Sequence, residues 1–79
     1  MAYTINNTVG TTLKTLADGT IDTTTTDLTL IGKGYAGFGE RLNENFVKLL
    51  ENFSNTTQPS NKIKGQLWYD SLNNQLNVY

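Results

Sequence analysis

The chain has 79 residues, seven acidic and six basic side chains, a net charge of −1, and neither cysteine nor histidine. This composition excludes disulfide bonds and thiolate metal sites, and it removes the commonest catalytic base and the commonest zinc ligand. A chain of this length buries only about 60% of the surface that its unfolded form exposes. We therefore expect one domain with a marginal core, which gains stability by oligomerisation or by attachment to a larger assembly.

The charge and hydropathy patterns argue against nucleic acid and membrane as partners. The basic residues form no run, so the sequence has no electrostatic footprint for nucleic acid. No apolar stretch approaches the roughly 20 residues that cross a bilayer, and the N-terminus lacks the basic and apolar regions of a signal peptide. We expect no nucleic acid, no membrane, no cofactor and no metal among the partners.

The N-terminal part is predicted to be β-structure. Two β-prone runs flank a turn rich in Asn and Gly, which predicts a β-hairpin over residues 3–16, and Asp18-Gly19 ends it. The four threonines at 23–26 are expected to form an extended connector. Residues 27–31 place leucines at alternate positions, as in a half-buried strand.

From residue 35 to residue 53 the apolar residues follow helical spacing, which predicts an amphipathic helix over 35–53. The apolar stripe consists of Leu42, Phe46, Leu49 and Phe53, and it is widened by Phe38 and Leu50. On the opposite face Glu44 precedes Lys48 by four residues, which is the favourable order for an ion pair. The stripe has two interpretations: it packs on a small antiparallel sheet as core, or it contacts equivalent helices of neighbouring subunits.

Residues 65–79 are predicted to form a second β-hairpin, with its turn after Asp70. One face of this hairpin, which we expect to be core, carries Leu67, Tyr69, Leu76 and Val78. Trp68 and Tyr79 lie on the opposite face. Because tryptophan is a common anchor in buried interfaces, Trp68 is predicted to contact another subunit or module. Packing of Trp68 within the chain is the alternative.

The segment from Gly32 to Gly37 matches the pattern G-x-G-x-x-G between a predicted strand and a predicted helix. In a dinucleotide-binding fold such glycines let a pyrophosphate approach a helix N-terminus. That site also requires a parallel βαβ unit with an acidic residue ending the next strand, whereas Glu51 lies in the predicted helix. We interpret Gly32, Gly34, Gly37 and Gly39 as residues that allow a tight strand-to-helix turn.

Catalytic chemistry finds little support in the sequence. Glu40 and Glu44 share a helical face and could form an acid–base pair, but a solvated face explains them as well. Without histidine, no serine or threonine has the usual base to activate it. We predict no catalytic residue and a protein that is not an enzyme.

Together the elements predict an α+β fold: two β-hairpins, one extra strand and a single amphipathic helix packed on antiparallel strands, in one module over residues 1–79. Two blocks then resemble a known family: Asn-Glu-Asn-Phe-Val-Lys-Leu-Leu-Glu-Asn-Phe at 43–53 and Gly-Gln-Leu-Trp-Tyr-Asp at 65–70. With Asp27 to Lys33, they resemble the N-terminal segment of tail-fibre-like and virion structural proteins of contractile-tailed phages, including cyanophages. The resemblance covers nearly the whole chain. It implies a structural role in the virion, a segment that opens a longer polypeptide, and a trimeric fibre.

The predicted function is therefore anchoring or assembly of tail-fibre or baseplate components by protein–protein contacts. The expected setting is a virion made in the host cytoplasm, with other virion proteins and further copies of the chain as partners. The expected interface residues are Trp68, Tyr79, Phe38, Leu42, Phe46, Leu49 and Phe53. One alternative is a small phage-encoded monomeric binding protein that acts on a host or virion partner; another is a minimal nucleotide-binding fold that uses the glycine turn.

Overall fold

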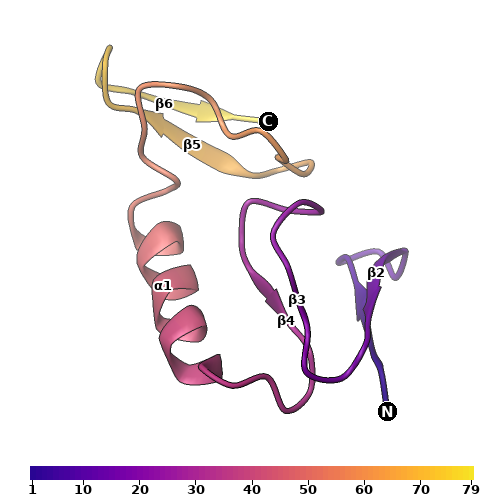
Figure 1. Ribbon diagram of the computed structural model, residues 1–79. Helices are drawn as coiled ribbons and strands as arrows, with labels where there is room; N and C mark the ends of the chain where they lie inside the picture. Colours follow the sequence, from indigo (N-terminus) through magenta and orange to yellow (C-terminus); the bar gives the residue numbers. More distant parts are fainter.

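The computed structural model describes residues 1–79 as three separate antiparallel two-stranded sheets and one helix, which confirms the predicted α+β class (Figure 1). The elements are β1 (Tyr3–Asn6), β2 (Thr12–Leu16), β3 (Ile21–Asp22), β4 (Leu30–Ile31), α1 (Phe38–Leu50), β5 (Leu67–Asp70) and β6 (Gln75–Val78). In Figure 1 the β3–β4 pair lies between β1–β2 and α1, and β5–β6 crosses one end of the molecule. The helix α1 is neither long nor apolar enough to cross a membrane.

The first hairpin lies where the sequence predicts it. β1 pairs with β2 from Tyr3 opposite Leu16, with a register irregularity between Ile5 and Asn6. The side chain of Asn7 shapes the turn, because its Oδ1 accepts the backbone N–H groups of Val9 at 3.1 Å and Thr11 at 2.9 Å. Leu16, at the end of β2, is 2% exposed and is the one apolar side chain that the chain buries fully.

The prediction for residues 20–31 was wrong in detail. Ile21–Asp22, for which the sequence predicted no element, forms a strand that pairs with Leu30–Ile31. The threonines at 23–26, predicted to be an extended connector, form bends instead. The chain reverses because the Asp22 Oδ1 accepts the N–H groups of Thr24 at 2.9 Å and Thr25 at 2.8 Å. The predicted strand over 27–31 shrinks to Leu30–Ile31. The backbone of residues 27–29 bonds to the side chains of Thr26, Asn45 and Lys48 and not to a neighbouring strand.

In the glycine-rich segment, the structure explains why three of the four positions are glycine. Gly32 is buried, and a Cβ built on it would lie 2.5 Å from the Ala17 carbonyl oxygen and 2.7 Å from the Thr20 carbonyl oxygen. Gly34 and Gly37 have positive φ angles, of 73° and 87°, which only glycine adopts freely. Gly39 lies in α1 with open space around it, so the turn does not require it.

The helix is shorter than the predicted range of 35–53 at both ends. It starts at Phe38, because Gly37 in the left-handed conformation cannot continue a right-handed helix. It ends at Leu50, because Asn52 and Phe53 also take positive φ angles, of 52° and 54°. These angles turn the backbone of Asn52 towards β5, where its carbonyl accepts the Tyr69 N–H at 2.9 Å.

The C-terminal hairpin pairs β5 with β6 in the expected region, with Trp68 opposite Asn77 and Tyr69 opposite Leu76. The other edge of β5 is covered by the segment after the helix. Asn55 donates its N–H to the Tyr69 carbonyl at 3.2 Å and accepts the Ser71 N–H at 3.1 Å. Residues 52–55 thus flank β5, a contact that the sequence did not predict.

The chain is elongated and open for its size. Its radius of gyration is 13.6 Å, whereas a compact domain of this length has about 11.6 Å. Its accessible surface is 5500 Å², against about 4800 Å² for a compact protein of this mass. The helix buries none of its residues. The expected packing of the stripe into an intrachain core therefore does not occur at Phe38 and Phe46, which are each about half exposed.

Candidate interaction surface

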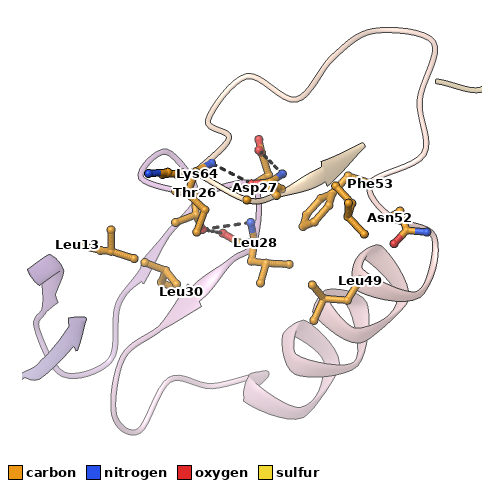
Figure 2. Close-up of a pocket in the computed structure, with 13 residues that line it drawn as sticks. Leu13, Thr26, Asp27, Leu28, Leu30, Leu49, Asn52, Phe53 and Lys64 are labelled. Carbon is orange, nitrogen blue, oxygen red and sulfur yellow. Dashed lines mark hydrogen bonds between the residues drawn. The ribbon is translucent and has the colours of Figure 1, made fainter. Parts of the chain in front are cut away.

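An apolar groove of about 510 Å³ lies where the separate sheets and the C-terminal end of α1 approach one another (Figure 2). Its hydrophobic lining consists of Leu13, Leu28, Leu30, Leu49, Phe53, Ile63 and Leu67. We call this set the apolar groove. Figure 2 shows Leu13 and Leu30 on one side and Leu49 and Phe53 on the other, with Leu28 between them.

Asp27 ties the wall of the groove to two distant segments. Its Oδ1 accepts the N–H of Asn61 at 3.0 Å, and its Oδ2 accepts the side-chain N–H of Gln66 at 2.9 Å. Its backbone carbonyl accepts the Lys48 Nζ at 3.3 Å. Both carboxylate oxygens are therefore engaged within the chain, and the groups that face outward from this groove are mainly apolar.

Asn45 attaches the helix to the same wall. Its Nδ2 donates to the Thr29 carbonyl at 2.8 Å, and its Oδ1 accepts the Thr29 N–H at 2.9 Å. This pair of bonds satisfies both backbone groups of a buried residue, as a neighbouring strand would do. The helix is thus held by a polar clamp on one flank of its apolar stripe, which leaves the other flank of the stripe uncovered.

Two aspartates fix the loops that end β3 and β5. Hydrogen bonds from the backbone N–H groups of Thr25 and Thr24, then from the Thr25 hydroxyl, lower the pKa of Asp22 from 3.8 to about 2, with a further contribution from the Lys14 charge. Burial acts in the opposite direction and is outweighed. The Asp22 carboxylate is therefore charged at neutral pH, and it accepts the hydrogen bonds that close its turn.

Asp70 closes the turn after β5 with a similar set of hydrogen bonds. The side chain of Asn73 donates to its Oδ2 at 2.9 Å, and the N–H groups of Leu72 and Asn73 donate to its Oδ1 at 3.0 and 3.2 Å. The Asn73 side chain is the main cause that lowers the pKa of Asp70, while burial opposes it.

The predicted interface residues do not form one surface. Leu49 and Phe53 line the apolar groove, whereas Phe38, Leu42 and Phe46 lie further along α1 and outside it. Leu42 is half-buried, and Phe46 is 52% exposed. The stripe therefore divides into a C-terminal part within the groove and an N-terminal part on the outer face of the helix.

Trp68 and Tyr79 line a separate, smaller depression together with Pro59 and Lys62. The indole N–H of Trp68 donates to the Asn55 carbonyl at 3.3 Å, and the Lys62 ammonium lies 5.1 Å from the centre of the Tyr79 ring. These contacts favour packing of Trp68 within the chain, and its contact with another subunit stays a prediction.

Sequence reasoning missed the polar residues that build the surface, above all Asp27 and Asn45. One signal was available for each. Asn45 sits in the helix next to the apolar stripe, and Asp27 opens the predicted strand between Thr26 and Leu28. Neither signal identifies the partner of the side chain, because both partners are backbone groups more than a dozen residues away.

Comparisons of this chain with protein-family models, with curated proteins and with solved structures find no match.

Proposed function

We propose that the chain is an assembly module of a phage virion that anchors or joins tail-fibre or baseplate components through protein–protein contacts. The observation that carries the proposal is the apolar groove, which the chain itself leaves open. Contiguous apolar surface of this kind on a small protein marks a contact site for another protein.

The small intrachain core supports the same function. Leu16 is the one buried apolar side chain. Six leucine and valine side chains outside the groove are each more than half exposed in the isolated fold: Val9, Val47, Leu50, Leu72, Leu76 and Val78. Fully burying one such side chain contributes about 1.5–3 kcal/mol. An assembly that covers even a few of them stabilises the chain by an amount comparable to the whole stability of a small domain.

The phage setting comes from the resemblance of residues 43–53 and 65–70 to tail-fibre-like virion proteins. Fibres of such proteins are typically trimeric, so we propose further copies and other virion proteins as partners. The strands before and after the helix, β4 and β5, belong to separate sheets. The parallel βαβ unit that a dinucleotide site requires is therefore not formed by these strands.

The experiment that tests the proposal measures the mass of the chain by sedimentation from low to high micromolar concentration. We expect association that Leu49→Glu weakens, because the new charge would be buried in the apolar groove. Leu50→Glu is the matched control, since Leu50 is the next helical residue and lies outside the groove. A monomer at every concentration would refute self-assembly and favour a monomeric binding protein. Equal effects of the two variants would refute the groove as the contact site.

A further inference from the structure

Strand β6 carries an unpaired edge. On its inner side it pairs with β5, and the pairing continues to Tyr79, whose N–H donates to the Gln66 carbonyl at 2.9 Å. In an antiparallel pair, successive residues point their backbone groups alternately towards the partner strand and away from it. Gln75, Asn77 and Tyr79 therefore face β5, and the N–H and C=O groups of Leu76 and Val78 point outward. No hydrogen bond from another part of the chain reaches these four groups.

The neighbouring edge of the same sheet is protected. Residues 52–55 cover the outer side of β5 at Tyr69, through both of its backbone groups, and extend to the N–H of Ser71. β3 and β4 have two residues each and offer little edge to a partner.

The first hairpin is protected in other ways. β2 carries Lys14, whose ammonium lies 3.5 Å from the Asp22 carboxylate, and β1 has a register irregularity between Ile5 and Asn6. Charges and irregularities are the usual means by which proteins block pairing at a strand edge. β6 has none of them: Gln75, Leu76, Asn77 and Val78 are uncharged, contain no proline and pair in regular register.

The side chains of β6 also favour pairing of its edge with another strand. Leu76 and Val78 are 53% and 71% exposed and lie on one face of the hairpin, together with Leu67. An uncharged strand meets no repulsion when it pairs with an identical strand. An antiparallel strand edge is also complementary to its own copy, because each donor has an acceptor related by a two-fold axis.

We propose that β6 pairs with β6 of a second copy of this chain, antiparallel about a two-fold axis. One register satisfies all four outward groups: Leu76 opposite Val78 of the second copy, and Val78 opposite its Leu76, with two hydrogen bonds in each pair. Asn77 then lies opposite Asn77 on the axis, and the two hairpins form a continuous four-stranded sheet. The inference goes beyond the proposed function, because this edge is separate from the apolar groove.

The size of the contact sets its strength. About five residues of each copy meet at the edge, fewer than the roughly 20–30 residues a side of a standard interface. The pairing is therefore weak, and it depends on concentration.

A cross-linking experiment tests the register directly. The chain has no cysteine, so Asn77→Cys introduces a single thiol at the two-fold axis. Opposed residues in a non-hydrogen-bonded pair have Cβ atoms about 4.5–5.5 Å apart, close to the geometry of a disulfide. We expect mild oxidation at high micromolar concentration to give a covalent dimer. Leu72→Cys, on the exposed turn of the same hairpin, is the control and should cross-link far more slowly. Equal rates for the two variants, or no dimer with N77C, would overturn the proposal.

A charge at the edge tests the same pairing without a cross-link. Val78→Lys should weaken dimerisation by about tenfold or more, because lysine on an edge opposes strand pairing. Leu72→Lys makes the same change at a residue of similar exposure, 69% against 71%, and should leave association unchanged. Circular dichroism checks that both variants fold. Association that survives V78K and fails with L49E would remove the edge contact and retain the proposed function, while the reverse result would retain the edge and remove the groove.

Discussion

The chain reverses after β3 and after β5 by the same kind of aspartate turn, but the two loops that follow differ in length and in the contacts they make. At the end of β3, Asp22 accepts two backbone N–H groups and a threonine hydroxyl; at the end of β5, Asp70 accepts two backbone N–H groups and an asparagine amide. The Asp70 loop then closes quickly, with Asp70 opposite Gln75. The Asp22 loop runs on to Leu30; it brings Asp27 to the groove and Thr29 to Asn45 of the helix.

The residues that close the turns are thus different from the residues that form the groove. A buried aspartate is sufficient to reverse the chain in both regions. In the N-terminal region, however, the extra loop residues are held by the Asn45 side chain of the helix, the backbone N–H of Asn61 and the side chain of Gln66. We therefore expect changes around β3–β4 to damage the groove, and changes around β5–β6 to act locally.

The largest expected effect is that of Gly32→Ala. The added methyl group would overlap two backbone oxygens, at 2.5 and 2.7 Å, which cannot move without separating β4 from the residues before β3. We expect a loss of about 2–3 kcal/mol in the free energy of unfolding, measured by urea denaturation at fixed protein concentration. The matched change in the C-terminal region, Gly65→Ala, meets no atom but has a φ of +89°, so it should cost about 1–2 kcal/mol. A larger effect at Gly65 would contradict the steric explanation.

The next largest effect is expected from Asn45→Ala. This change leaves the N–H and C=O of buried Thr29 without partners, which should lower the free energy of unfolding by about 2 kcal/mol. Asn43→Ala is the control, because Asn43 is exposed on the same helix and makes no such bond. Similar denaturation midpoints for the two variants would show that the clamp does not hold the helix.

Acid should weaken both turns, and the Asp22 turn more strongly. A carboxylate whose pKa is lowered by folding stabilises the folded state at pH values above its unfolded pKa, and this contribution disappears as the pH falls towards its folded pKa. For Asp22 the window runs from 3.8 down to about 2. We expect the urea midpoint to fall across this range. Asp22→Asn should remove more of the pH dependence than Asp70→Asn, and the opposite order would contradict the comparison.

The smallest expected effect is that of Tyr69→Phe. It removes an exposed hydrogen bond of 3.1 Å from the tyrosine hydroxyl to Asn74 Oδ1 at the C-terminal turn. Asp70 continues to hold that turn, so the free energy of unfolding should change by about 0.5 kcal/mol or less. A loss above about 1 kcal/mol would show that the aspartate alone is not sufficient to close this loop.

Local patterns in the sequence predicted the parts of the fold that depend on neighbouring residues. The two hairpins and the helix follow from alternation, helical spacing and turn residues, all within about 15 positions. The β3 strand was missed because it is two residues long and because Asp22 acts through a hydrogen-bonded turn. The helix ends were misplaced because left-handed angles at Asn52 and Phe53 depend on contacts with β5.

The candidate surface could be predicted only in part. Leu49 and Phe53 were identified from the helical stripe, and both line the groove. Leu13, Ile63 and Leu67 join them only through tertiary structure, since they come from three separate segments. The uncovered edge of β6 was also hidden from sequence reasoning, because its exposure depends on which side of β5 is already covered by residues 52–55.

The small number of buried positions has an evolutionary consequence. Only six of the 79 residues are buried, and exposed substitutions away from special features usually change stability by about 0.5 kcal/mol or less. Substitutions at most positions therefore have little effect on the stability of the isolated chain. Selection that keeps an exposed position apolar must come from a partner that contacts it. Among related sequences, Leu76 and Val78 should accordingly vary less than Val9 and Leu72, which are also largely exposed but lie in turns.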